Sequence, residues 1–174
     1  MAVRVEAGEY AVSGKNVEVA RTLVIPVDPP YSRAYQAEAV AISDEQVNQW
    51  RGGSHLLKVL GPVDKGTRLP YAIDPASVRV RSAPCGGTAY EENKDYILDH
   101  VWGAISRVPT GSIPQGAKVY VDYAVLDQRI DAVQVSPLGV VSVKMGRPAP
   151  AVPVIPEVDK GCNRLANIFV NRRT

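Results

Sequence analysis

The residues that could bind a metal ion or attack a substrate are few and widely spaced. His55 and His100 do not stand in a close metal-binding spacing, and neither Cys85 nor Cys162 lies near them in the sequence. Structural zinc sites normally show paired ligands a few residues apart, so the fold alone would have to assemble a site from these four residues. The glycine and serine patterns of nucleophile elbows, phosphate-binding loops and dinucleotide-binding folds do not occur either. The sequence therefore predicts no metal site and no cofactor.

Carboxylates are the remaining candidates for catalysis. Two carboxylates about 5–9 Å apart can cleave a glycosidic bond, so a glycan-cleaving enzyme is one alternative. In this chain the candidates flank predicted strands or alternate with apolar residues within them, which is typical of solvent-facing positions. We therefore predict that the protein is not an enzyme and has no catalytic residues. The five aspartates of this group are Asp95, Asp99, Asp122, Asp127 and Asp131.

Aromatic side chains could instead stack on sugar rings. The chain has eight tyrosines and two tryptophans. Tyr96, Tyr120 and Tyr123 occupy strand positions where packing in the core or at its rim is expected. Trp102 precedes a glycine in a turn-like stretch and could be exposed. A carbohydrate- or receptor-binding β module, with a host-surface glycan as its ligand, is therefore the alternative function.

Cys85 and Cys162 both lie in predicted loops, and each is next to a glycine. They could pair with each other, pair across subunits or remain free thiols. The first residues carry charges of both signs and no apolar core, so no signal peptide is expected and the chain would fold in a reducing cytoplasm. We predict that both cysteines lie at or near the surface and that at least one can form a disulfide between subunits in a mature extracellular particle. The alternative is two inert thiols packed under loops.

The charge balance restricts the possible partners. Lys and Arg number 20 and Asp and Glu number 18, which gives a formal net charge of +2. This balance excludes a nucleic-acid or anionic-membrane binder that depends on bulk charge. No apolar run approaches the ~18 residues that a membrane helix needs. We expect neither nucleic acid nor a membrane as a partner.

The apolar composition favours an all-β fold. Val and Ile far outnumber Leu, and 14 Gly and 14 Pro interrupt the chain. β-Branched residues suit strands and lose side-chain freedom in helices, and the frequent Gly and Pro leave few intervals for a helix of about 11 residues. We predict antiparallel β-sandwich-type modules with at most one short helix. That helix is expected at 43–50, where Ser43 and Gln46 could form a capping box.

Alternation of apolar and polar residues with a period of two marks the expected strands. Residues 78–81 alternate cleanly, with Arg79 and Arg81 expected on a solvated sheet face. The strands are predicted at 2–7, 10–12, 17–25, 38–42, 55–60, 68–73, 77–81, 95–99, 103–107, 118–124, 129–135, 140–145 and 165–170.

A proline-rich segment lies between the last two predicted strands. Residues 147–160 should run extended along a surface, because prolines fix the backbone and cannot donate to a ladder. Such a segment has few hydrogen bonds of its own, so we expect this arm to contact a neighbouring subunit. The residues predicted for that contact are Pro148, Pro150, Pro153 and Pro156.

The second half of the chain also contains a series of short motifs in a fixed order. They are Asp95-Tyr96-Ile97-Leu98-Asp99, Gly103-Ala104-Ile105, Ile113-Pro114-Gln115-Gly116, Val119-Tyr120-Val121-Asp122-Tyr123, Arg129-Ile130-Asp131, Gly139-Val140-Val141-Ser142-Val143, Gly146-Arg147-Pro148-Ala149 and Leu165-Ala166-Asn167-Ile168. Over residues 88–171 this order resembles a β module of tailed-bacteriophage virion proteins, found near the attachment regions of tail-fibre and baseplate-associated proteins. Residues 1–87 show no such resemblance. We therefore predict an N-terminal β region at 1–87 and a phage-tail-like β module at 88–174.

The resemblance implies a structural virion protein that joins neighbouring subunits at the tail, collar or fibre attachment. The related pattern usually continues into a fibre shaft, whereas this chain ends at Thr174, which favours a small adaptor, collar or fibre-anchoring subunit. The expected partners are other virion proteins and copies of the chain itself, with threefold or sixfold symmetry. The expected location is the virion, after assembly in the cytoplasm of the bacterial host.

Overall fold

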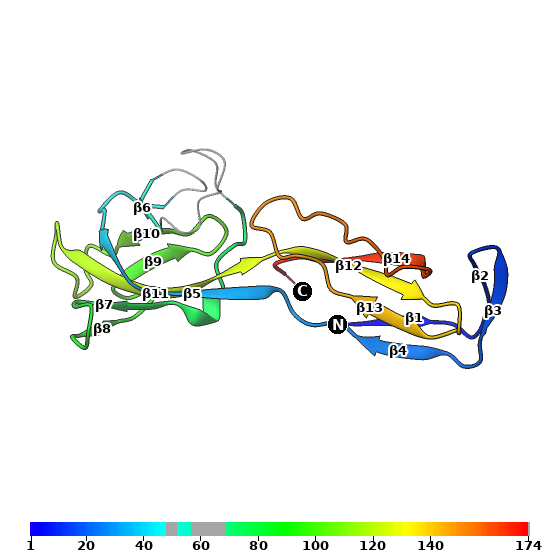
Figure 1. Ribbon diagram of the computed structural model, residues 1–174. Coiled ribbons are helices and arrows are strands. Elements are labelled where there is room, and N and C mark those ends of the chain that lie inside the picture. The colour runs from blue at the N-terminus through cyan, green and yellow to red at the C-terminus, as the bar shows by residue number, and fades with distance from the viewer. Residues whose placement is uncertain (48–51, 57–68, 174) are drawn as a thin grey trace. The chain divides into compact units, whose positions relative to one another are not determined.

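The computed structural model describes residues 1–47, 52–56 and 69–173 and has an all-β fold, as the composition predicts (Figure 1). Its one described helical element is a 3-10 turn, η2 (Pro75–Ser77), which the Asp74 side chain caps by accepting a hydrogen bond from Ala76 N. The strands are β1 (Ala2–Val5), β2 (Gly8–Val12), β3 (Lys15–Val19), β4 (Leu23–Pro26), β5 (Tyr31–Ala41), β6 (Ser54–His55), β7 (Arg79–Arg81), β8 (Ala89–Tyr90), β9 (Tyr96–Asp99), β10 (Ala104–Arg107), β11 (Lys118–Asp127), β12 (Arg129–Val135), β13 (Val141–Lys144) and β14 (Asn163–Val170).

The chain forms two compact units, and one is inserted into the other. Unit 1 combines Met1–Tyr31 with Asp127–Thr174, and unit 2 is Ser32–Leu126. This division differs from the predicted boundary between residues 87 and 88. The physical reason is that strands from the two ends of the chain pack together in unit 1. Strands β5 and β11 carry the chain into unit 2 and back out of it.

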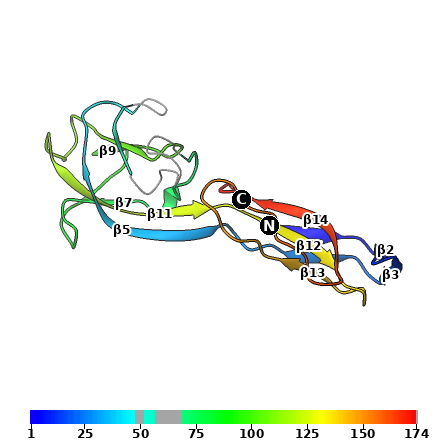
Figure 2. The same ribbon diagram turned by 45° about the horizontal axis from the view of Figure 1, so that its top comes forward.

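Unit 1 is built on a sheet of strand order β13-β12-β14 (Figure 2). Val133 of β12 lies opposite Val143 of β13 and Ala166 of β14, and the register with β14 shifts after it. The antiparallel β1–β4 ladder forms a second layer, and the β2–β3 hairpin closes the core at one end. The hairpin packs Val12 and Val19 against Val135.

The strand predicted at 17–25 is two strands in the structure. β3 pairs with β2, whereas β4 pairs with β1, and residues 20–22 connect them. Thr22 stabilises this connection because its hydroxyl accepts a hydrogen bond from Ala7 N and donates one to the Glu6 carboxylate. The strand-like composition of 17–25 therefore concealed a change of ladder at Ala20-Arg21-Thr22.

Unit 2 contains a sheet of order β5-β11-β7-β8 and a sheet of order β6-β10-β9. Val121 of β11 lies opposite Val80 of β7, and Ile105 of β10 lies opposite Leu98 of β9. All four side chains are buried. The alternation predicted at 78–81 is confirmed, since Val78 and Val80 are buried and Arg79 is exposed, although Arg81 is only half-exposed.

The helix predicted at 43–50 is not present in its described part, residues 43–47. Ser43 instead forms a parallel bridge with Ser106, and its carbonyl accepts a hydrogen bond from Arg107 N. Asp44 then pairs with the Arg107 guanidinium at 2.5 Å. Pairing of this segment with β10 therefore takes precedence over the capping box that Ser43 and Gln46 could have formed. Three parts of these predictions lie outside the described residues: 48–50 of the helix, 57–60 of the strand predicted at 55–60, and residue 68 of the strand predicted at 68–73. The described residues 56 and 69–73 belong to no named strand.

Candidate functional site

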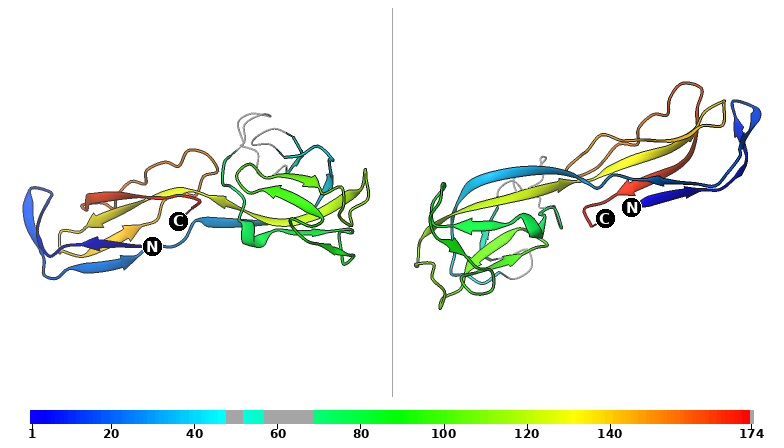
Figure 3. Two further views of the ribbon diagram at one scale, coloured as in Figure 1. Left: turned by 180° about the vertical axis from the view of Figure 1, so that it is seen from behind. Right: turned by 90° about the horizontal axis from the view of Figure 1, so that it is seen from below.

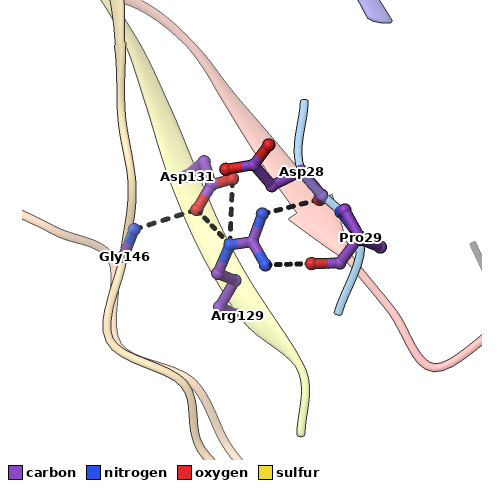
Figure 4. Close-up of polar contacts among 5 residues, drawn as sticks. All are labelled: Asp28, Pro29, Arg129, Asp131 and Gly146. Atoms are coloured by element: carbon purple, nitrogen blue, oxygen red, sulfur yellow. Dashed lines mark hydrogen bonds and ion pairs between the residues drawn. The ribbon is translucent and has the colours of Figure 1, made fainter. Parts of the chain in front are cut away.

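A buried ion pair lies at the start of β12. Arg129 and Asp131 are two residues apart on one strand, so their side chains lie on the same face. Arg129 Nε donates to Asp131 Oδ1 at 2.9 Å and to Oδ2 at 3.1 Å, and the two side chains are only 2 % and 1 % exposed. The ion pair therefore belongs to the interior of unit 1 (Figure 4).

The remaining polar atoms of this pair bind backbone groups of two other segments. Arg129 Nη1 donates to Pro29 O at 2.5 Å, and Nη2 donates to Asp28 O at 2.7 Å. Gly146 N donates to Asp131 Oδ1 at 2.9 Å. The pair thus fixes both the segment that leads to β5 and the segment that follows β13. We call Arg129, Asp131 and these backbone partners the clamp.

The clamp marks the beginning of the arm at 147–160, which is held on unit 1 at its first end. Gln128 and Ala149 form an antiparallel bridge, with hydrogen bonds of 2.8 and 3.2 Å. The Gln128 side chain donates to Ala151 O, and Arg172 donates to Pro150 O. Burial lowers the pKa of Arg172 from its ordinary value. The first residues of the arm are therefore fixed in place.

The far end of the arm is held by Asp159. Its N–H donates to Gln134 Oε1 at 2.8 Å, and its carboxylate accepts from Gln134 Nε2 at 2.5 Å and from Lys144 Nζ at 2.6 Å. The bond from Lys144, followed by that from Gln134, holds the pKa of Asp159 below its ordinary value. Arg164 also donates to Pro156 O at 2.6 Å. The arm is thus a strap over the sheet that is bound at both ends.

The middle of this strap presents apolar side chains to solvent. Val152, Val154 and Ile155 are 82 %, 75 % and 48 % exposed. The four prolines predicted as contact residues, Pro148, Pro150, Pro153 and Pro156, are all half-buried. Sequence reasoning found the arm through its prolines, but the side chains that face outward are those between the prolines.

The prediction that the five aspartates face solvent is wrong for three of them. Asp95, Asp127 and Asp131 are buried, at 4 %, 5 % and 1 % exposure. Asp131 is compensated by Arg129, and Asp95 accepts hydrogen bonds from Glu91 N and Ser112 N.

The other two predicted carboxylates also make structural contacts. Asp122 accepts from Arg81 Nη2 at 2.6 Å and from Ala37 N at 2.8 Å. Asp99 accepts from the N–H groups of Val101 and Trp102 in the turn after β9. These side chains fix turns and strand pairings.

Asp95 should make unit 2 sensitive to acid. The backbone hydrogen bonds from Glu91 and then Ser112 hold the pKa of Asp95 below its ordinary value. A depressed pKa in the folded state adds stability above the ordinary pKa of about 3.9, and that contribution is lost as the pH falls through the folded-state pKa. We expect Asp95→Asn to be less stable than the wild type near neutral pH, and the gap to shrink below about pH 4.

Urea titrations of both proteins over this pH range measure that gap. Glu157→Gln, at an exposed position, is the matched control. A gap between wild type and Asp95→Asn that stays constant down to low pH would contradict the assignment.

The three strand tyrosines lie in the core or at its rim, as expected. Tyr96 and Tyr123 are 4 % and 2 % exposed, and the Tyr123 hydroxyl donates to Glu38. Tyr120 and Trp102 are half-buried. Tyr96 also lines a small surface pocket of unit 2, of about 190 Å³, together with Tyr90, Arg79, Arg81 and Asp122.

The predicted metal-ligand candidates are not brought together in the described residues. No group of three His, Cys, Asp or Glu side chains that could hold a metal ion is found within that part of the chain. His100 Nε2 contacts Glu92 at 2.7 Å, and the side chain of His55 lies outside the described residues. Within the same residues, no helix is long and apolar enough to cross a membrane.

The two cysteines lie in different units. Cys85 is exposed in the loop between β7 and β8, and Cys162 is half-buried in the turn before β14. Both are free thiols. The positions agree with the expected loops, and the pairing of these residues stays a prediction.

The comparisons with known proteins give one partial similarity. No protein-family model and no solved structure matches the chain. Over 60 residues the chain is 42 % identical to a tail sheath protein of Burkholderia phage BcepMu. The match covers 33 % of this chain and only 13 % of that relative. The similarity supports a phage-tail-related structural protein, without indicating which part of the tail.

Proposed function

We propose that the chain is a structural component of a phage virion that joins neighbouring subunits at the tail, collar or fibre attachment. The observation that carries this proposal is the arm at 147–160, which holds exposed apolar side chains in fixed positions. A packing subunit needs such a surface, whereas a monomeric protein gains nothing from fixing Val152 and Val154 in water. The partial similarity to a tail sheath protein supports the same class of function.

Immunoelectron microscopy of intact particles tests the location. Antibodies against unit 1 should label the tail, collar or fibre attachment at a regular number of sites. Limited proteolysis tests the contact: the 147–160 arm should be cut more slowly in the particle than in the isolated chain. Unlabelled particles, or equal cutting rates in both states, would contradict the proposal.

Enzymatic activity is not part of the proposed function. Four of the five aspartates considered as catalysts, Asp95, Asp99, Asp122 and Asp131, are engaged in backbone or ion-pair contacts within the two units. Turnover of a polysaccharide that is lost on mutating a single Asp would refute this.

A carbohydrate- or receptor-binding role remains the second candidate, because of the pocket in unit 2 lined by Tyr90 and Tyr96. A host-surface glycan that occupies this pocket should raise the melting temperature of the isolated protein. The Arg79→Ala variant, which changes an exposed pocket residue, should lose that shift. A glycan array without any binding would remove this candidate.

We predict that at least one of Cys85 and Cys162 forms a disulfide between subunits in the mature particle. The exposed position of Cys85 makes it the more accessible of the two thiols. Such a link could stabilise the assembly by about 2–4 kcal/mol, compared with about 0–1 kcal/mol for a surface ion pair. Non-reducing electrophoresis of purified particles should show a band above the monomer that disappears on reduction. A monomer band in both lanes, with both thiols open to alkylation after denaturation, would rule the disulfide out.

A further inference from the structure

Unit 1 has an apolar groove between its two layers. The groove lies between β1 and the β12–β14 pair and has a volume of about 300 Å³. Its apolar lining consists of Val3, Val5, Tyr10, Val133, Leu165 and Ala166. That volume would hold about ten water molecules in the liquid. The groove is therefore large enough for two or three small apolar side chains.

The rim of this groove is neutral. Arg4 and Glu6 line it and pair with each other at 2.8 Å, with side chains that are 68 % and 62 % exposed. The two charges are already matched, so the groove does not favour a charged ligand. It favours an uncharged apolar segment.

The arm provides a segment with those properties. Residues 148–156 carry no charge, and Val152, Val154 and Ile155 are the exposed apolar side chains within them. Among the described residues, none forms a hydrogen bond with these three. We call these three residues the ridge. Since both ends of the arm are bound to unit 1, the ridge is already ordered and loses little freedom on binding.

The ridge and the groove lie on opposite faces of the β13-β12-β14 sheet. Val133 lines the groove, and its neighbour Gln134, which points to the other face, binds Asp159 of the arm. The arm and β1 lie on opposite sides of this sheet in both views of Figure 3. The ridge of one molecule therefore cannot enter the groove of the same molecule.

We propose that the ridge of one copy docks into the groove of a second copy. Val152 and Val154 stand on either side of the half-buried Pro153, and both are exposed to solvent. Val3 and Val5 of β1 give the groove an apolar wall. The two surfaces match in apolar character and in absence of net charge. Because they are different surfaces, the contact is head-to-tail, and repetition gives a ring or an open helical array.

This inference rests on the proposed function, since it names the partner of the same arm. Sedimentation velocity over a range of concentrations measures the self-association. Val154→Asp removes the ridge, and Ala166→Trp fills the groove at an exposed lining position without removing a core side chain. Each variant alone should associate roughly 30-fold or more weakly than the wild type.

A mixture of the two variants gives the sharpest result. The intact groove of Val154→Asp can accept the intact ridge of Ala166→Trp, so a 1:1 mixture should form a heterodimer and nothing larger. Leu138→Asp is the matched control, because Leu138 is 88 % exposed in the β12–β13 turn and belongs to neither surface. Circular dichroism and melting temperature confirm that each variant is folded.

Several outcomes would overturn the inference. They are wild-type protein that stays monomeric up to about 1 mM, normal association of Ala166→Trp, or a mixture that behaves as two monomers. If particles are labelled by antibody but the isolated chain does not self-associate, the proposed function stands and only this inference fails. If the ridge and groove associate but particles contain none of the chain, the proposed function fails instead.

Discussion

Asp131→Ala should lower the free energy of unfolding by about 3–5 kcal/mol, as expected for one partner removed from a buried ion pair. The substitution leaves the Arg129 guanidinium inside unit 1 with only the carbonyls of Asp28 and Pro29 as partners. It also removes the acceptor of Gly146 N. Both unpaired groups sit where water cannot replace the lost bonds, since Arg129 is 2 % exposed.

Urea unfolding, followed by circular dichroism, measures this effect. Arg129→Ala should lower the free energy of unfolding by a similar amount, because it leaves the buried Asp131 carboxylate without its cationic partner. Arg4→Ala is the matched control: it removes an arginine from an ion pair on the surface of the same unit, and the expected cost is below about 1 kcal/mol. A loss below about 1 kcal/mol for Asp131→Ala would show that the pair is not buried in solution.

Replacing both residues tests whether the clamp provides stability or positions the chain. Well-packed apolar replacements of a buried ion pair are often neutral for stability. Arg129→Met combined with Asp131→Leu should therefore be more stable than either single alanine variant. The double variant still lacks the bonds to Pro29 and Gly146, so its arm should be cut faster by protease than that of the wild type.

The fold class can be predicted from the sequence because fold class depends on local properties of the chain. β-Branched composition and period-two alternation require nothing beyond neighbouring residues, and the strands at 118–124 and 129–135 lie within β11 and β12. The division into units depends on which strands pair, and alternation carries no information about partners. β1 pairs with β4 and lies over β12 and β14, from the other end of the chain, so no feature at residue 87 could reveal it.

The clamp shows a second limit of sequence reasoning. The apolar neighbours Ile130 and Ala132 favour a solvent-facing Asp131, but alternation along β12 places Asp131 on the same face as Val133 and Val135. In the structure both faces of β12 are covered. Asp131 is buried on the same face as Val133, beside the segment at Asp28 and Pro29, and Gln134 is buried on the opposite face, beneath the arm. The usable signal was the spacing of an arginine and an aspartate two residues apart, which allows an ion pair within one strand. The motifs Arg129-Ile130-Asp131 and Gly146-Arg147-Pro148-Ala149, noted for the phage resemblance, are the ones that meet at the clamp.

Gly146→Ala is expected to cost about 3 kcal/mol or more, at the upper end of overpacking effects. A Cβ on Gly146 would lie 1.9 Å from Ile130 O and 2.9 Å from Ile130 C. These atoms belong to the backbone of β12, so they cannot rotate away as a side chain could. The segment at 146 must therefore move off the strand, which breaks the bond between Gly146 N and Asp131 Oδ1.

Gly116→Ala is the control that separates this clash from the general cost of replacing glycine. Its Cβ would meet nothing within 4 Å, and only its φ of +71° is unfavourable, at about 1–2 kcal/mol. Because part of this cost is the lost bond to Asp131, the effect of Gly146→Ala should also depend on that residue. In the Asp131→Ala background the additional cost of Gly146→Ala should be smaller by about 0.5–3 kcal/mol, the range of coupling between contacting residues. Strictly additive losses in this double-mutant cycle would show that Gly146 and the ion pair stabilise unit 1 independently.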